Sequence, residues 1–483
     1  MLPDPDNVQS LIIARYRHRY RVVLLFQISD PVAAQGFLRK WVPDVNGGLQ
    51  PPSSYQAGLD GAAGTPDPVY HFAFSWRGIS KLLKARRSET QGLNPDAVAN
   101  HLESFFTKEE NAPHSRSVAA SLDMKDVNAP ENWWAEDTDP AGFHIALFCY
   151  FGDEAQKKQG LENIRREATE SGLREWQFPS FEDKALSGKV PPGGILHFGF
   201  RDGVSKVEID WEDADKPGKV NFRELLLGYP SDQYPLSPAE PGPWREFVRD
   251  GTYVNLAWLY QDVATFNRFL RENRGAAEPH SGAEDPEEWL AAKMMGRWRN
   301  GSALALHPEG KPASNDTSNK FGYQNDANGE TTPLFSHIRV CNPRDQGLTS
   351  VNEARFPNGP PRLVRRGFSY GPPLQGEEDD GRDRGLVGVF ACSRINEQFY
   401  TVVRWIQKTS FSDQFDSIKN GRKRQDMMFG FRKKHNAETT THIPVTPEGS
   451  VPLKLPLADF IRYRGLAVFL APSLKSLRYL AGD

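Results

Sequence analysis

Short apolar runs separated by helical patterns recur along the whole chain of 483 residues. Runs rich in Val, Ile, Leu, Phe and Tyr that end at polar residues, Gly or Pro are typical of strands. We expect strands at 16–29, 69–75, 143–151, 194–200, 251–260, 386–392 and 465–470. Apolar positions at helical spacing, often opened by Asp or Pro, predict helices at 31–42, 78–85, 153–171, after 262, at 285–298 and at 396–408.

The order of these elements predicts an α+β fold that repeats once. Strand–helix–strand units occur in both halves and favour two antiparallel sheets, although the halves share no visible sequence identity. Five prolines lie between Tyr229 and Trp244, and proline cannot continue a sheet. We therefore expect an N-terminal domain at 1–228, a Pro-rich linker at 229–244 and a C-terminal domain at 245–483. Residues 103–139, rich in Pro, Asn and charge, look like an insertion.

Composition narrows the class of protein without naming its chemistry. Charged residues make up 25% of the chain and the net charge is −3, so nothing favours a nucleic acid or another polyanion as partner. No apolar run reaches the roughly 18 residues of a membrane helix. The N-terminus lacks the features of a secretory signal, so a cytoplasmic location is expected. Export by an unconventional route and assembly into a homo-oligomer are both compatible with this sequence.

The three cysteines, Cys149, Cys341 and Cys392, are not spaced for a zinc site or a redox pair. We interpret them as small hydrophobic residues of a reducing compartment. The chain also lacks the P-loop, the HExxH pair and the GxSxG elbow, which argues against three large enzyme classes.

The segment 334–344, Leu-Phe-Ser-His-Ile-Arg-Val-Cys-Asn-Pro-Arg, carries the first candidate chemistry. The imidazole of His337 could bind a metal, and the guanidinium of Arg339 could bind a carboxylate on the same ligand. A haem needs both functions, an axial nitrogen for the iron and a cation for a propionate. A single histidine is more often structural, so this segment needs support from other motifs.

Two further motifs provide that support. Gly199-Phe-Arg-Asp-Gly203 places Asp202 on a tight turn, where it is either part of an ordinary Asp-Gly turn or a carboxylate that moves protons in a pocket. Residues 362–371, Arg-Leu-Val-Arg-Arg-Gly-Phe-Ser-Tyr-Gly, form either a solvated edge or, through Arg365, a cation that faces developing negative charge.

These three motifs, in this order, closely resemble those of the dye-decolourising peroxidases. Further agreeing segments are LLLGYP at 225–230, DGTYVNLAWLYQDV at 250–263, GRWRNG at 296–301, QFYTVVRW at 398–405 and VFLAPS at 468–473. The resemblance covers 194–483 well, whereas 1–190 agrees only in the order of elements. The segment Val-Ser-Lys-Val after Gly203 departs from the commoner Ile-Ser-x-Pro.

The resemblance implies two ferredoxin-like domains and a haem b (iron protoporphyrin IX), bound mainly by the C-terminal domain through His337 as the axial iron ligand. It implies Asp202 as the distal acid–base and Arg365 as the distal arginine. Arg365 is preferred to Arg366 because it lies five residues before the Tyr370-Gly371 pair. Arg339 is expected to bind a haem propionate.

The family also pairs the axial histidine with a carboxylate. Asp413 and Asp416 lie in the right region, but no motif distinguishes them, so this role stays open.

The implied activity is a peroxidase that uses hydrogen peroxide to oxidise dyes and phenolic or other aromatic reductants in one-electron steps. A carboxylate base stays ionised at acid pH, where a histidine would be protonated, so an acidic optimum is expected. Bulky dyes would react through surface Trp or Tyr residues, among which the sequence does not choose.

Three alternatives stay open. A haem carrier or iron-handling protein would use the same pocket with little turnover, although it would need neither Asp202 nor Arg365. The basic run 419–424 prompts a nucleic-acid or interaction module, but a short run in an acidic chain is more typical of a solvated loop. A binding module without a metal would be colourless.

Overall fold

The computed structural model describes most of the chain. The described residues are 1–4, 6–12, 16–42, 65–86, 93–94, 103, 106, 112–134, 138–205, 207–234, 240–407, 426–430, 440–446, 449–454, 456 and 458–482. The carboxylates Asp413 and Asp416 and the basic run 419–424, all considered above, lie outside these residues. So do 235–239 of the Pro-rich segment and several parts of 103–139.

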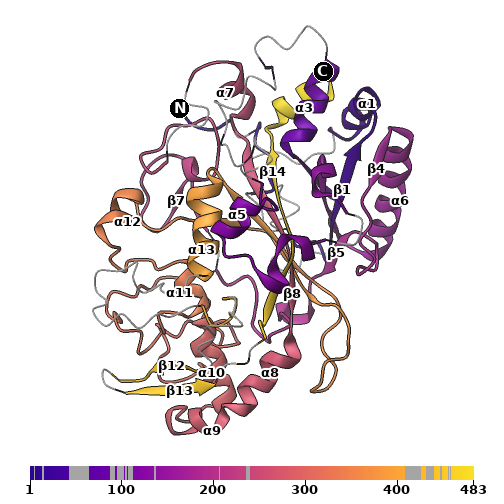
Figure 1. Ribbon diagram of the computed structural model, residues 1–483. Coiled ribbons are helices and arrows are strands. Elements are labelled where there is room, and N and C mark those ends of the chain that lie inside the picture. Colours follow the sequence, from indigo (N-terminus) through magenta and orange to yellow (C-terminus); the bar gives the residue numbers. More distant parts are fainter. Residues whose placement is uncertain are drawn as a thin grey trace.

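One large antiparallel sheet of ten strands organises the fold. Its order is β10 (Phe368–Tyr370), β11 (Gly385–Cys392), β8 (Thr252–Gln261), β14 (Ile461–Ala471), β2 (Val69–Phe74), β3 (Ile145–Phe151), β1 (Tyr20–Ile28) and β4 (Leu173–Glu175). In addition, β5 (Leu186–Lys189) pairs with β1, and β9 (Val364–Arg365) pairs with β11. The strands at one end of this order come from the C-terminal half of the chain, and those at the other end come from the N-terminal half (Figure 1).

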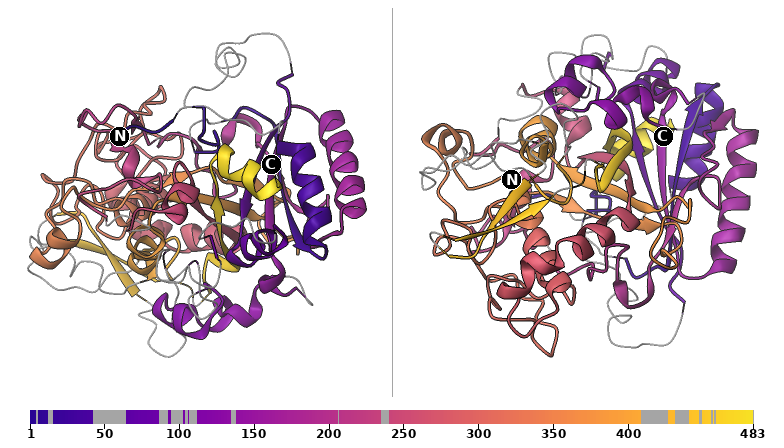
Figure 2. Two further views of the ribbon diagram at one scale, coloured as in Figure 1. Left: turned by 90° about the horizontal axis from the view of Figure 1, so that it is seen from above. Right: turned by 60° about the horizontal axis from the view of Figure 1, so that its bottom comes forward.

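Helices cover the strands of each half. The N-terminal strands are accompanied by α1 (Pro31–Trp41), α3 (Trp76–Ala85) and α6 (Glu154–Glu170). The carboxylate of Asp30 accepts the N–H groups of Val32 and Ala33, and Pro31 occupies the first turn, which explains where α1 begins. The C-terminal helix α14 (Leu474–Ala481) packs on α1 and α3, and Figure 2 shows it in yellow beside the indigo α1.

The C-terminal half holds most of the remaining helices. They are α7 (Pro243–Val248), α8 (Val263–Glu272), α9 (Arg274–Ala277), α10 (Pro286–Met295), α11 (His337–Cys341), α12 (Ser350–Arg355) and α13 (Thr401–Gln407). Of these, α11 packs against both α10 and α13. Short elements complete the fold: α5 (Arg116–Ser121), the pair β6 (Ile209–Asp210) and β7 (Val220–Asn221), and the hairpin β12 (Thr440–Pro444) and β13 (Ser450–Lys454).

Strands of the two halves contact each other on two sides of the sheet. Strand β14 pairs with β2 through the single residue pair Leu470 and Phe74. On the other side, β5 packs against β10 so closely that a Cβ on Gly188 would overlap the carbonyl group of Ser369. The sheet therefore curls until strands from its two ends touch, and one continuous hydrophobic core runs through both halves.

Most predicted elements are confirmed, within a few residues at their ends, and the fold is α+β as expected. The strand predicted at 194–200 is wrong. A 3₁₀ turn at Pro192–Gly194 and a tight turn with Gly199 at φ 86° occupy this segment, and left-handed glycines interrupt a strand. The helix predicted at 396–408 begins as a π-helical turn, Ile395–Tyr400, and continues as α13.

The predicted domain limits stay a prediction, since part of the linker is outside the described residues and α14 lies against the N-terminal half. Among the described residues, no helix combines the length and apolar character that crossing a bilayer requires.

Candidate active site

His337 opens α11, and its imidazole is held by a buried carboxylate. Its Nδ1 atom lies 2.8 Å from Oδ2 of Asp426, whose side chain has no exposed surface. The other carboxylate oxygen of Asp426 accepts the backbone N–H groups of Met428 and Phe429 at 2.8 and 2.9 Å. Because the carboxylate is fixed in this way, Nδ1 is the donor and Nε2 is left to bind a metal.

Cys341 lies one helical turn after His337. Its Sγ atom is 3.7 Å from Nε2 and 3.9 Å from Nδ1 of His337. Cys149 and Cys392 are buried as expected, but Cys341 is only half-buried. Burial lowers the pKa of His337, while Cys341 and Asp426 raise it, and the net result is a pKa well above the ordinary value. Cys341 and Asp426 therefore favour the protonated form of this imidazole.

Sequence reasoning missed Asp426. We considered Asp413 and Asp416, which lie outside the described residues, whereas the carboxylate found next to His337 is Asp426. The available signal was an acid placed directly before the apolar run Met427–Phe429. An acid at the start of such a run is well placed to accept the following backbone N–H groups, as Asp426 does.

Asp202 lies on an exposed turn. Gly199 and Gly203 flank it with φ of 86° and 80°, and its N–H donates to the carbonyl of Gly194 at 2.7 Å. The preceding residue, Arg201, donates its N–H to the carbonyl of Arg299 at 2.9 Å. The turn is thereby attached to the loop after α10.

Arg365 and Arg366 differ in what they contact. The guanidinium of Arg366 donates to the carbonyl groups of Ile12 and Arg365, at 2.7 and 3.0 Å. Arg365 sits on β9 opposite Phe390 of β11 and is exposed, and its guanidinium makes no hydrogen bond or ion pair with another residue that the structure describes. The guanidinium of Arg365 is therefore available to a ligand, whereas that of Arg366 is engaged in hydrogen bonds to backbone carbonyl groups.

Four arginines, Arg297, Arg344, Arg362 and Arg365, form what we call the arginine cluster. Burial lowers the pKa of Arg297 to about 10, and the charges of Arg344 and Arg365 add to this effect. Burial also lowers the pKa of Arg362, again with Arg344 and Arg365 contributing. Within the described part of the chain, no carboxylate forms an ion pair with any of the four. The cluster is thus suited to an anionic ligand.

Asn319 links the Asp202 turn to this cluster. Its Nδ2 donates to the carbonyl of Val204 at 2.6 Å, and its Oδ1 accepts from Arg297 at 2.6 Å. Its carbonyl accepts from Arg344 at 2.9 Å. No sequence motif pointed to Asn319, because its role depends on contacts between segments far apart in the chain.

Arg339, which we expected to bind a propionate, is buried and hydrogen-bonded within the protein, and its propionate role stays a prediction. Its side chain has no exposed surface and lies over the ring of Tyr323. Four of its five N–H donors are used, by Gln346, the carboxylate and carbonyl groups of Asp326, and the carbonyl of Thr332. The guanidinium therefore holds the loops that precede and follow α11.

Comparisons with known proteins point to one group of similar proteins. No protein-family model matches the chain. A curated relative, Dye-decolorizing peroxidase msp1 of Mycetinis scorodonius, is 27% identical over 319 residues, which are 61% of this chain and 58% of that protein. A dye-decolorizing peroxidase of Mycena epipterygia is 30% identical over 251 residues, 47% of this chain and 45% of the relative. The chain thus matches less than two thirds of the length of these relatives.

Solved structures extend the likeness to the whole fold. An ancestral D-type dye-decolorizing peroxidase superposes with a TM-score of 0.76 at 23% identity over 99% of both chains. A variant of the enzyme from Pleurotus ostreatus has a TM-score of 0.77 at 19% identity, again over 99% of both. The chain is related to the dye-decolourising peroxidases.

The donor groups of this dye-decolourising peroxidase fold fit a haem. His337 offers Nε2, the ring nitrogen that does not contact Asp426, and an imidazole nitrogen is the ligand a haem iron needs. The arginine cluster offers positive charge without carboxylate partners among the described residues, which suits the two propionates.

Proposed function

We propose that this protein is a haem-dependent peroxidase that uses hydrogen peroxide to oxidise dyes and phenolic or other aromatic reductants. The observation that carries the proposal is the hydrogen bond between Nδ1 of His337 and the buried carboxylate of Asp426. A solved relative of the same fold is a complex of a dye-decolorizing peroxidase with 2,6-dimethoxyphenol, which supports a phenolic reductant.

In this proposal haem b is held through Nε2 of His337. Asp426 keeps the opposite nitrogen protonated and makes the imidazole a stronger electron donor. When bound, the haem supplies an iron that accepts electrons from a reductant after peroxide has oxidised it. The residues of the chain then have two tasks, to hold the cofactor and to move the protons of the peroxide.

Asp202 and Arg365 are proposed to do the second task. Asp202 takes a proton from the inner oxygen of bound hydrogen peroxide and returns it to the outer oxygen, which leaves as water. The charge of Arg365 stabilises negative charge on the departing oxygen. Its exposure and its lack of acceptors among the described residues support this role for Arg365 over Arg366.

We assign the propionates to Arg344 and Arg362 rather than to Arg339. Both belong to the arginine cluster and neither is in an ion pair among the described residues, whereas Arg339 is committed to Asp326. Each charge-assisted contact of this kind is stronger than a neutral hydrogen bond, because both groups are ionised.

The test is an absorption spectrum of the purified protein after addition of haem. The His337→Ala variant is compared with His280→Ala, which removes an exposed histidine in the 3₁₀ turn that precedes α10. We expect a Soret band in the parent and in His280→Ala, and a shifted or absent band in His337→Ala. A parent protein that takes up no haem overturns the proposal. Haem uptake without peroxide-dependent oxidation of 2,6-dimethoxyphenol identifies the haem-carrier alternative instead.

A further inference from the structure

A pocket lies where the two halves of the sheet diverge. Phe74, the last residue of β2, forms the one pair with Leu470 of β14. The chain then turns into α3. Strand β14 continues, so residues 467–469 have no described strand beside them on this edge. A cavity of about 180 Å³ fills the gap and is bordered by 467–469 and by the start of α3 at Ser75–Arg77. We call it the seam pocket.

The segment interpreted as an insertion covers the same edge of β14. The N–H of Trp134 donates to the carbonyl of Arg464 at 2.5 Å, and Oδ1 of Asn128 accepts the N–H of Tyr463 at 2.8 Å. Phe106 and residues 112–114 of this segment form the outer wall of the seam pocket. The insertion thus closes most of the unpaired edge and leaves a cavity over the rest.

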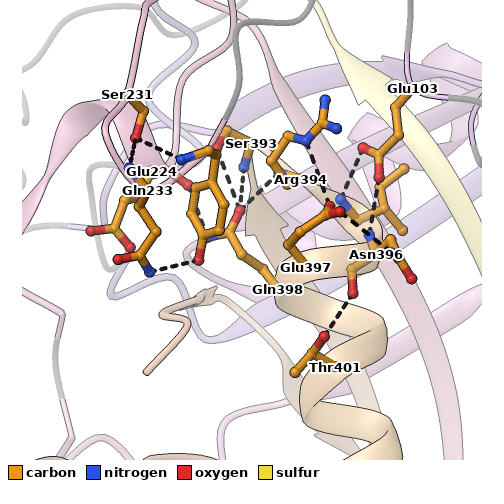
Figure 3. Close-up of polar contacts among 12 residues, drawn as sticks. Glu103, Glu224, Ser231, Gln233, Ser393, Arg394, Asn396, Glu397, Gln398 and Thr401 are labelled. Carbon is orange, nitrogen blue, oxygen red and sulfur yellow. Dashed lines mark hydrogen bonds and ion pairs between the residues drawn. The ribbon is translucent and has the colours of Figure 1, made fainter. Parts of the chain in front are cut away.

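The outer wall is fixed to the C-terminal half through Glu103. Figure 3 shows the Glu103 carboxylate at the start of the π-helical turn, where it accepts the N–H groups of Ile395 and Asn396, both at 3.0 Å. Phe106, three residues later, donates its N–H to the carbonyl of Glu103 at 2.9 Å. The position of this wall is therefore held by buried hydrogen bonds.

The lining of the seam pocket combines aromatic rings with the cation of Arg77 and the imidazole of His114. Rings come from Trp76, Phe106, Phe143 and Phe469, and nitrogen groups come from Arg77 and His114. An apolar cavity of about 150 Å³ accommodates one benzene molecule, so this volume suits one substituted ring. Flat apolar walls favour an aromatic ligand, and a guanidinium favours a carboxylate on it.

The pocket shares one row of the sheet with Arg365. Arg365 of β9 is opposite Phe390 of β11, Phe390 is opposite Asn255 of β8, and Asn255 is opposite Val468 of β14. Residues directly opposite in antiparallel strands point to the same face. Three strand steps of about 4.8 Å separate the ends of this row by about 14 Å. Val468 lines the seam pocket, so the pocket begins at the end of the row that starts at the proposed distal arginine.

We propose that the seam pocket binds a single-ring phenolic carboxylate that serves as a reducing substrate. The role as reductant rests on the proposed peroxidase function, whereas the binding itself does not. The ring lies among Trp76, Phe106 and Phe143, and the carboxylate faces Arg77.

The test measures binding and turnover of 4-hydroxycinnamate, with 4-hydroxycinnamamide as its neutral counterpart. Ala141→Leu and Ala112→Leu each place a larger side chain in the wall, and Arg77→Gln removes the cation. Lys84→Gln, on the same helix but outside the pocket, is the matched control. Calorimetry on the full-length protein measures affinity, steady-state kinetics measure KM, and thermal melting confirms that each variant is folded.

We expect Ala141→Leu to weaken binding of both compounds at least about tenfold, because the added atoms take ligand volume. Arg77→Gln weakens the binding of 4-hydroxycinnamate about twofold to fivefold, as expected for the loss of a partly exposed ion pair, and leaves the binding of the amide unchanged. KM for 4-hydroxycinnamate rises in parallel, while kcat/KM for hydrogen peroxide stays at the parent value. In the Lys84→Gln control, both the affinity and KM stay at parent values.

Two outcomes separate the pocket from the proposed function. Parent-like affinity in Ala141→Leu, or in Ala112→Leu where the first variant is unfolded, overturns the pocket proposal even in an active peroxidase. Binding that the two filling variants abolish, in a protein with no peroxidase activity, sustains the site and removes only its role as a reductant site.

Discussion

Oδ2 of Asp426 lies 2.8 Å from Nδ1 of His337, although 89 positions separate the two residues in the chain. The carboxylate reaches the imidazole from outside α11, after a segment beyond the described residues. Two backbone N–H groups hold it in place, so it can orient the histidine without moving itself. The properties of the His337 imidazole therefore depend on a residue far away in sequence.

Replacing Asp426 tests this dependence. In Asp426→Asn the ring loses its anionic partner, so we expect a less electron-donating ligand, a higher haem reduction potential and a haem affinity about 10- to 100-fold lower. Spectroelectrochemistry and haem titration measure the two effects. Asp316→Asn is the control, because it removes the carboxylate of a second Asp–His pair, Asp316 with His307, at 2.7 Å. An unchanged potential in Asp426→Asn would show that the pair is only structural.

The two neighbouring arginines should differ sharply. Arg365→Leu removes a cation that no described residue uses, and we expect kcat/KM for hydrogen peroxide to fall about 10²- to 10³-fold with little change in melting temperature. Arg366→Leu removes the bond to the Ile12 carbonyl and should lower stability more than activity. Stopped-flow mixing with peroxide and thermal melting separate the two. The reverse pattern would move the distal role to Arg366.

Asp202 is expected to be required for the peroxide step alone. Asp202→Asn keeps the shape of the turn and removes the base, so kcat/KM for hydrogen peroxide should fall about 10²- to 10⁴-fold, while haem uptake stays at the parent level. Glu208→Gln, on the same loop and exposed, serves as the control. A parent-like peroxide rate in Asp202→Asn would exclude Asp202 as the acid–base.

Arg339 should matter for stability more than for cofactor charge. Arg339→Leu leaves the carboxylate of Asp326 without its partner at 3.1 Å, and breaking a buried pair in this way costs about 3–5 kcal/mol of the free energy of unfolding. Urea denaturation of the haem-free protein measures this loss without any propionate present. A normal midpoint there, with haem binding weakened, would restore the propionate role expected from the sequence motif.

Two buried carboxylates predict a stability that falls towards alkaline pH. Burial raises the pKa of Glu103 and of Glu224 from 4.5 to about 7, against opposing effects of Arg394 and Arg362 respectively. The folded state binds these protons more tightly than the unfolded state, so their stabilising effect is complete below pH 4.5 and is lost as the pH rises through 7. The loss is on the order of 1–3 kcal/mol for each group.

Urea midpoints measured between pH 5 and pH 8 test this slope. Glu224→Gln should flatten it, because the neutral amide has no proton to lose, whereas the exposed Glu246→Gln should leave it unchanged. A slope of equal size in Glu224→Gln would mean that other groups cause the pH dependence.

The sequence predicted the parts of the site that depend on neighbouring residues. The short helix at His337, the glycine turn at Asp202 and the strand at Arg365 follow from local motifs, whereas the roles of the three residues stay predictions. The partners Asp426 and Asn319 could not be found, since they meet the motifs only after the chain has folded. The motif also suggested a propionate role for Arg339, where the tertiary structure provides Asp326.

The same distinction applies to the fold. Strand and helix periods were visible wherever one face is apolar. The strand predicted at 194–200 does not form, because two left-handed glycines, Gly194 and Gly199, interrupt its apolar residues. No sequence pattern indicated the seam pocket, because it exists only where β2 ends at its single pair with β14.

Strand β14 lies between β8 and β2 in the middle of the sheet, yet it is the last strand in the order of translation. The C-terminal half cannot pair this edge of β8 until β14 has been synthesised, and the single pair that joins β14 to β2 also forms only then. The edge of β8 therefore stays open until late in synthesis, which favours slow folding and exposes this edge to aggregation.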